Sequence, residues 1–118
     1  FDSVDVAGAA VLISTGWDAH FGTERYGAPG HPFLATEAAA WLADRGAVLV
    51  GIDSVNIDAT TTGERPAHSG LLAAGIPVVE HLTGLDRLPA TGATFSAVPV
   101  KVAGLATFPV RAFASVPD

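Results

Sequence analysis

Two short apolar runs with a helix-forming segment between them constrain the fold of this chain more than any other feature. The runs, residues 6–15 and 47–52, are rich in Ala, Val, Leu and Ile, which suits strands buried on both faces. A helix that connects two such strands forms a right-handed β-α-β crossover. The pattern therefore predicts an α/β fold with a mixed sheet and flanking helices.

The connecting helix is expected over residues 36–45. Thr36 is a residue type that caps helix N-termini, Glu37 places a negative charge in the first turn, and Gly46 marks the stop. Before this helix, residues 17–32 mix aromatic and polar side chains with Gly and Pro. Loops of this length in compact domains are often functional.

The chain continues with a further helix and strand. A two-turn helix is expected over residues 67–74 and a strand over residues 76–80. The helix rises about 10 Å at roughly 1.5 Å per residue, and the strand covers about 15 Å at roughly 3.3 Å per residue. An antiparallel return of this kind brings Glu80 back near His68.

Two more strands are expected over residues 95–102 and 107–114, joined as a hairpin through residues 103–106. Pro99 and Pro109 each remove a donor from the hydrogen-bond ladder. These strands are therefore expected to carry edges or bulges.

The composition restricts the classes of partner. At 118 residues the chain fits one domain, and its 49% hydrophobic and 15% charged residues leave apolar surface that we expect to meet another chain in a homo-oligomer. The net charge of −6 and the scattered basic residues argue against nucleic acid and anionic membranes as partners. No apolar run approaches the ~20 residues needed to cross a bilayer. Cysteine is absent, which excludes disulfides and thiolate metal ligands.

The chain begins with Phe1 and contains no methionine, so we expect it to be one portion of a longer polypeptide. Asp2 and Asp5 stand where a signal peptide would have a basic segment. We expect a cytoplasmic protein.

His68 and Glu80 are the first candidates for a functional site. A neutral imidazole and a carboxylate suit zinc or manganese, but a catalytic site usually has three protein ligands and an open position. The alternatives are a partly exposed histidine near a helix start and a carboxylate at an exposed strand end. On residue type alone, the alternative is favoured for His68.

A second group of candidates lies in the loop before the first helix and after the second strand. Residues that could bind a substrate are Trp17, Asp18, His31 and Phe33, with His20 and Tyr26 beside them. A loop that packs its own aromatic side chains explains them equally well. Asp53, Ser54 and Asp58 could orient ligands, but Asp and Ser after a strand are more often turn formers.

Several segments occur in an order that is informative as a set: LISTGWD at 12–18, GHPF at 30–33, AAAWL at 38–42, GIDS at 51–54, residues 68–80, and VPVKV at 98–102. In this order they resemble the cyclase-like metal-dependent hydrolases, a family that includes bacterial kynurenine formamidase and isatin hydrolase. The resemblance extends over about residues 10–113. It implies a swivelling β/β/α fold, with residues 1–118 as the C-terminal portion of a single hydrolase domain.

The resemblance also implies a site with one or two divalent ions, zinc or manganese, that cleaves an amide, lactam or formamide C–N bond through a metal-activated water. His68 and Glu80 match the family's metal ligands in this region. The family signature HxGTHxDxPxH, which supplies the remaining ligands and a catalytic histidine, is absent from this sequence. We expect an N-terminal segment or a second chain to complete the site. The alternative is a non-catalytic binding or assembly module of the same fold.

Overall fold

The computed structural model describes residues 3–118, which divide into two compact units, the first ending at Asp86 and the second beginning at Arg87. The first unit contains three strands, β1 (Ala10–Ile13), β2 (Leu49–Ile52) and β3 (Val78–Val79). It also contains the helices α1 (Thr36–Asp44) and α2 (Pro66–Ala73) and the 3₁₀ helix η1 (Trp17–His20). A second 3₁₀ helix, η2 (Leu85–Arg87), lies at the junction, and the second unit holds β4 (Thr94–Val98) and β5 (Arg111–Ser115).

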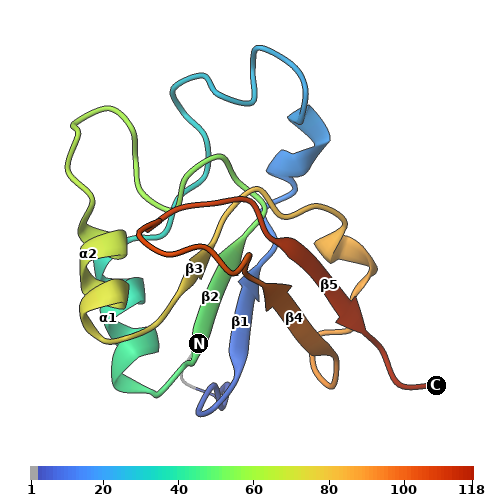
Figure 1. Ribbon diagram of the computed structural model, residues 1–118. Helices are drawn as coiled ribbons and strands as arrows, with labels where there is room; N and C mark the ends of the chain where they lie inside the picture. Colours follow the sequence, from blue (N-terminus) through green and yellow to red (C-terminus); the bar gives the residue numbers. More distant parts are fainter. Residues whose placement is uncertain (1–2) are drawn as a thin grey trace. The chain divides into compact units, whose positions relative to one another are not determined.

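The strands of the first unit form a parallel sheet in the order β1-β2-β3 (Figure 1). Ala10 pairs with Leu49 at the start of the β1–β2 ladder, and Val50 pairs with Val78 in β2–β3. Helix α1 connects β1 to β2, and α2 connects β2 to β3. The predicted α/β class and the parallel β-α-β connection are therefore confirmed.

The burial of the strands depends on their place in the sheet. Residues Val50 to Ile52 of the central strand β2 are buried, whereas all four residues of β1 are half-buried. The prediction that the first strand is buried on both faces is wrong, because side chains on both faces of β1 stay partly exposed, and among residues 3–118 β1 is an edge strand of its sheet. Both strands are also shorter than the apolar runs that predicted them.

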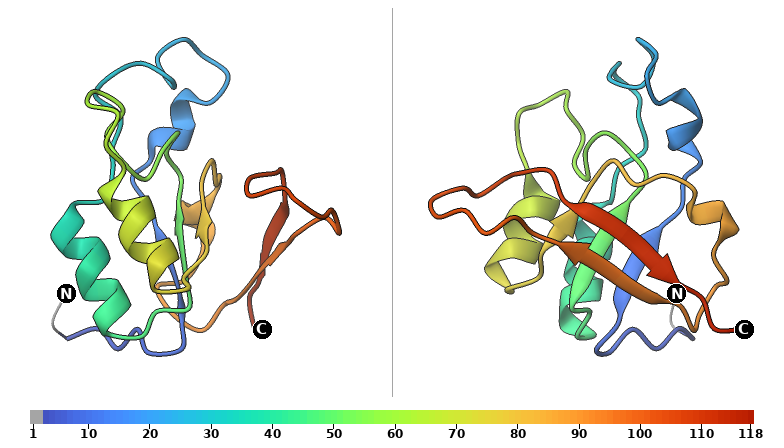
Figure 2. Two further views of the ribbon diagram at one scale, coloured as in Figure 1. Left: turned by 60° about the vertical axis from the view of Figure 1, so that its left-hand side comes forward. Right: turned by 45° about the vertical axis from the view of Figure 1, so that its right-hand side comes forward.

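Helices α1 and α2 lie side by side on one face of the three-stranded sheet (Figures 1 and 2). Buried residues from both helices and from the sheet form one hydrophobic core, whose members are Val6, Ala39, Leu42, Ala47, Val50, Ile52, Ile57, Ala67, Leu71 and Ile76. Because Ala67 belongs to this core, the first turn of α2 is held firmly against the sheet.

Helix α1 begins at Thr36, but the residue in the capping position is Ala35, so the predicted capping role of Thr36 is wrong. The Ala39 N–H donates to the Ala35 carbonyl oxygen at 3.0 Å and closes the first turn. The Leu34 N–H donates to the Ile57 carbonyl oxygen at 2.8 Å, which fixes the chain before the helix. The predicted stop is confirmed, since Gly46 adopts φ 80°, a left-handed conformation that favours glycine.

The second unit is an antiparallel pair in which Thr94 lies opposite Ser115 and Val98 lies opposite Arg111. The predicted pairing is confirmed, but the predicted short connection over residues 103–106 is wrong, because the connection covers residues 99–110. Pro99 has no N–H to donate, and the ladder stops immediately before it.

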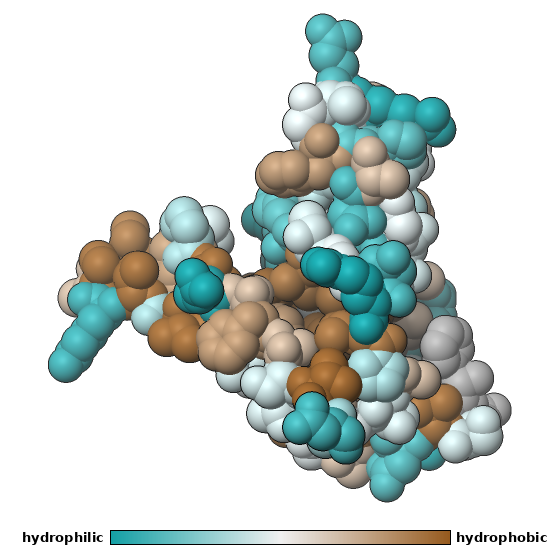
Figure 3. Space-filling model, turned by 90° about the vertical axis from the view of Figure 1, so that its right-hand side faces the viewer, coloured by the Kyte–Doolittle hydropathy of each residue, from teal (hydrophilic) through white to brown (hydrophobic). Residues whose placement is uncertain are grey.

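Exposed apolar side chains concentrate on this second unit, as the brown surface at the left of Figure 3 shows. Those of the second unit are Val98, Val100, Val102, Leu105, Phe113 and Val116. No helix within residues 3–118 has the length and hydropathy needed to span a membrane.

Candidate metal centre

The N-terminus of α2 is held by a carboxylate from a distant loop. Pro66 opens the helix, where its missing N–H costs nothing, and the preceding residue, Arg65, provides no side-chain cap. Asp58 takes this role instead: its Oδ1 accepts the Ala67 N–H at 2.7 Å, and its Oδ2 accepts the His68 N–H at 3.0 Å. These bonds satisfy N–H groups that have no partner inside the helix. They also fix the backbone that carries the His68 side chain.

Asp58 also contacts the imidazole ring of His68, with Oδ2 at 2.7 Å from Nδ1. An ionised carboxylate only accepts hydrogen bonds, so Nδ1 carries the shared proton. In the neutral imidazole, Nε2 is then the nitrogen with the free lone pair. Asp58 is 2% exposed, and its burial acts to raise the pKa of the carboxyl group. The backbone N–H groups of His68 and Ala67 and the His68 ring outweigh this effect, so the pKa of Asp58 lies below its usual value.

Glu80 follows β3 directly, and its Oε1 lies 3.2 Å from Nε2 of His68. The Ile57 N–H donates to the same Oε1 at 2.8 Å. Ile57 and Asp58 are neighbours in the chain, so one short segment orients both candidate side chains. The two side chains are 13% and 21% exposed, and the expected proximity of His68 and Glu80 is observed.

The pair fits a divalent cation. With the proton on Nδ1, Nε2 is an acceptor 3.2 Å from a carboxylate oxygen, and two acceptors this close need a positive charge near them. Two ligands at about 2.0–2.1 Å from a tetrahedral zinc ion lie about 3.3 Å apart, close to the 3.2 Å separation here. Within residues 3–118, no group of three or more His, Cys, Asp or Glu side chains is arranged to hold a metal ion. The described residues thus contain two candidate ligands, His68 and Glu80, and the carboxylate of Asp58 is hydrogen-bonded to the other ring nitrogen of His68.

A basic side chain also reaches this position. Nη2 of Arg65 lies 3.0 Å from Nε2 of His68. Arg65 is exposed and precedes the first residue of α2.

Asp53, at the end of β2, fixes the turn that follows β1. Its carboxylate accepts the backbone N–H groups of Thr15 and Gly16 at 2.8 and 2.9 Å and the Thr15 hydroxyl at 2.6 Å. Asp53 is buried, and these donors account for its charge. It is a turn-forming residue for the loop that carries Trp17 and Asp18.

His31, a predicted substrate-binding residue, is buried with both ring nitrogens engaged. Nδ1 lies 3.0 Å from the Pro32 carbonyl oxygen, and Nε2 lies 3.3 Å from the Thr60 hydroxyl. The Ser54 hydroxyl donates to the same Pro32 oxygen at 2.7 Å. These bonds join the loop after β1 to the loop after β2.

The other predicted substrate-binding residues are placed differently. Trp17 is half-buried and donates its indole N–H to the Tyr26 carbonyl oxygen at 3.0 Å, while Asp18 accepts the Gly84 N–H at 2.8 Å. Phe33 is 54% exposed. Trp17 and Asp18 are consecutive residues of η1, and the loop packs its own rings in pairs, Trp17 with His20 and Phe21 with Tyr26.

Tyr26 connects this loop to the residue after Glu80. Its hydroxyl lies 3.0 Å from Nδ1 of His81, which adopts φ 61°, a left-handed conformation uncommon outside glycine. Burial raises the pKa of the Tyr26 hydroxyl above its usual value, and the negative charges of Asp53, Asp18 and Glu80 raise it further. Of these charges, that of Glu80, the candidate ligand, has the smallest effect.

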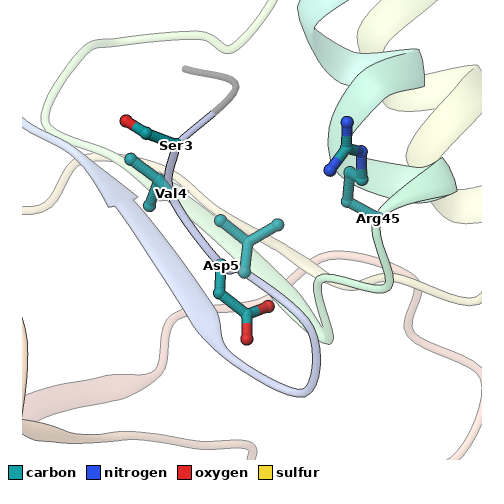
Figure 4. A pocket seen from close by; sticks show the side chains of 5 residues that line it. Ser3, Val4, Asp5 and Arg45 are labelled. Carbon is teal, nitrogen blue, oxygen red and sulfur yellow. The ribbon is translucent and has the colours of Figure 1, made fainter.

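A separate hollow lies at the segment before β1 (Figure 4). It has a volume of about 210 Å³, and its lining residues are Ser3, Val4, Asp5, Val6 and Arg45. None of the predicted site residues lines it.

Sequence reasoning missed two contacts at the centre. The sequence indicates Asp58 as a possible ligand-orienting residue, but it predicts neither the pairing of Asp58 with His68 nor the contact of Arg65 with His68. Both contacts depend on the path of residues 59–65, which places the start of α2 beside Asp58. One sequence signal could have indicated the Asp58 contact. Arg65, which precedes the helix, is not a capping residue type, so an acidic side chain shortly upstream, Asp58, is a candidate to accept the first N–H groups of the helix.

Comparison with known proteins gives a consistent result. The profile of the "Putative cyclase" family matches residues 3–59. Kynurenine formamidase from Polaromonas naphthalenivorans is 35% identical over 79 residues, which cover 67% of this chain and 35% of that protein. The crystal structure of an isatin hydrolase bound to the product analogue thioisatinate has a TM-score of 0.84 at 31% identity and covers 95% of this chain and 47% of its own.

A structure described as a potential metal-dependent hydrolase with cyclase activity matches with a TM-score of 0.74 at 30% identity, over 95% of this chain and 53% of the other. The chain belongs to the cyclase-like hydrolase family. It spans about a third of the length of the kynurenine formamidase and about half of the two solved structures.

Proposed function

We propose that this chain supplies one half of the metal centre of a hydrolase that cleaves the C–N bond of a small amide, lactam or formamide. His68 and Glu80 are the metal ligands in this proposal, and a further segment or a second chain provides the rest. The observation that carries it is the separation of 3.2 Å between Nε2 of His68 and Oε1 of Glu80, with Asp58 behind the ring. The names of the relatives, kynurenine formamidase and isatin hydrolase, support the substrate class.

Each side chain has a defined task in this proposal. Asp58 keeps the proton of His68 on Nδ1 and so presents the Nε2 lone pair to the cation. The Ile57 N–H holds one carboxylate oxygen of Glu80 in place, which reduces the reorganisation needed for binding. A divalent ion bound there, zinc or manganese, supplies the Lewis acid that activates water and polarises a carbonyl group. A carboxylate that ligates a metal is a poor base, so we assign the proton transfers to a residue outside this chain.

The test uses the complete protein that contains this chain, stripped of metal with a chelator. Hydrolysis of an aryl formamide and of isatin is measured with and without added zinc or manganese, together with the metal content. His68→Ala and Glu80→Ala are expected to lower both metal content and metal-dependent turnover by about 100-fold or more, since loss of an outer partner alone costs about 10–100-fold. Glu24→Ala, an exposed loop carboxylate, serves as the control and should leave both unchanged. Undiminished metal content and turnover in both ligand variants would contradict the proposal.

A second candidate function is a non-catalytic binding or assembly module. Two observations favour it: the exposed apolar side chains of the second unit, and the lack of a three-ligand group within residues 3–118. The same experiment separates the two functions. A complete protein that retains no divalent ion and hydrolyses neither substrate supports the module.

A further inference from the structure

We propose that the guanidinium group of Arg65 occupies the Nε2 lone pair of His68 and must leave it before a divalent ion binds, so that Arg65 lowers the metal affinity of the centre. The inference rests on the proposed function, because it takes His68 and Glu80 as the ligands. Beyond those ligands, it assigns a role to Arg65, whose guanidinium group the metal ion has to displace from His68.

The contact itself identifies the acceptor. Nη2 of Arg65 is 3.0 Å from Nε2 of His68. A guanidinium has donors and no acceptor, so this bond forms only when Nε2 is unprotonated. The bond from Nδ1 to Asp58 requires the same tautomer, and the two hydrogen bonds are therefore mutually consistent.

The same lone pair of Nε2 would bind the metal. A neutral imidazole has one such lone pair, so an Arg65 N–H and a divalent ion cannot use it together. Arg65 also places a positive charge beside a nitrogen that lies 3.2 Å from Oε1 of Glu80. Within the described residues its side-chain contact is with His68 alone, so Arg65 competes with the metal for the imidazole and leaves the Glu80 carboxylate free to bind it.

The arrangement makes displacement inexpensive. Arg65 is exposed and immediately precedes the first residue of α2. Its side chain can turn into solvent without disturbing the core. Loss of one exposed hydrogen bond of this kind corresponds to about a 2- to 10-fold change in an equilibrium constant.

The experiment measures zinc affinity directly in the complete protein, stripped of metal, by competition with a chromophoric chelator. Arg65→Ala is expected to bind zinc about 2- to 10-fold more tightly than the wild type. Arg65→Lys should lie between the two, because an ammonium retains the charge without the planar fork of donors. Arg45→Ala is the matched control, since it removes one positive charge from the end of α1, where Arg45 lies over the Trp41 ring, and it should bind zinc as the wild type does.

The outcomes separate this inference from the proposed function. Equal or weaker zinc binding by Arg65→Ala, with Arg45→Ala unchanged, overturns the role of Arg65. If His68→Ala binds zinc as tightly as the wild type, the ligand assignment itself fails. Circular dichroism checks folding, and Arg65→Gln, a neutral side chain of similar shape, replaces the alanine variant if that variant unfolds.

Discussion

Nδ1 of His68 lies 2.7 Å from Oδ2 of Asp58, and this hydrogen bond determines which ring nitrogen faces Glu80. The same carboxylate accepts two backbone N–H groups at the start of α2. One buried side chain therefore both positions the helix and sets the tautomer of the candidate ligand.

Asp58→Asn is expected to impair both roles of this residue. An amide keeps the size of the side chain but presents an NH₂ group to at least one of the three donors that the carboxylate now accepts. We expect a loss of about 1–3 kcal/mol in the free energy of unfolding and a 10- to 100-fold weaker zinc affinity. Urea denaturation and zinc titration measure the two effects. Asp44→Asn, at the exposed end of α1, is the control and should change neither quantity.

Asp58 also predicts how stability depends on pH. Its folded-state pKa lies below the ordinary value of 3.8, so the ionised form is the one that the fold stabilises. Its contribution is fully present above the unfolded-state pKa and is lost as the pH falls through the lower folded-state pKa. Unfolding free energies measured from neutral to acidic pH should therefore fall more steeply below about pH 4 in the wild type than in Asp58→Asn. Parallel curves for the two proteins would contradict this assignment.

Tyr26 gives a prediction at the alkaline end. Burial and the charges of Asp53, Asp18 and Glu80 raise the pKa of its hydroxyl above 10.0, so the fold stabilises the neutral form. This stabilisation is fully present below the unfolded-state pKa and is lost as the pH rises through the higher folded-state pKa. Ultraviolet absorbance of tyrosinate, taken as the difference between the wild type and Tyr26→Phe, measures the pKa. Glu80→Gln should lower it, and a Tyr26 pKa at or below 10.0 in the wild type would refute the prediction.

Gly51, in the central strand, tests the packing of the sheet face that carries Leu12. A Cβ atom at this position would lie 2.7 Å from Cδ1 of Leu82 and 2.8 Å from Cδ2 of Leu12. Gly51→Ala is therefore expected to destabilise the fold by about 1–3 kcal/mol in chemical denaturation. Gly70→Ala provides the contrast: beyond its chain neighbours and the backbone of its own helix, a Cβ atom added there would meet no atom within 4 Å, and the site is helical, so the change should stabilise by about 0.5–1 kcal/mol. Equal changes in the free energy of unfolding at the two positions would contradict the predicted crowding of Leu12 and Leu82 by a side chain at position 51.

The sequence predicted the local elements and their order because each has a short-range cause. Apolar runs identified β1 and β2, and Gly46 correctly marked the end of α1. Burial at the edge of the sheet was not predictable, because it depends on which strands pair and not on the apolar run itself. The short hairpin turn was wrong for a related reason: Pro99 ends the ladder earlier than hydrophobic pattern alone indicates.

The candidate site was only partly accessible from sequence. The chain reverses direction between α2 and β3 within a few residues, and the lengths of the two elements follow from the sequence. The proximity of His68 and Glu80 was therefore predictable. The contacts of Asp58 and Arg65 with His68 depend on the path of an exposed polar loop, which has no hydrophobic periodicity to read. His31 is predicted either to bind a substrate or to pack within its loop, and its hydrogen bonds to Pro32 and Thr60 depend on contacts that the sequence pattern does not indicate.

The measurement that tests the central claim most directly is anomalous diffraction from crystals of the complete protein grown with zinc. The account predicts an anomalous peak about 2.0–2.1 Å from Nε2 of His68 and about 2.0–2.2 Å from a carboxylate oxygen of Glu80, with Asp58 still bonded to Nδ1. A fully occupied zinc ion elsewhere, with neither His68 nor Glu80 among its ligands, would contradict it.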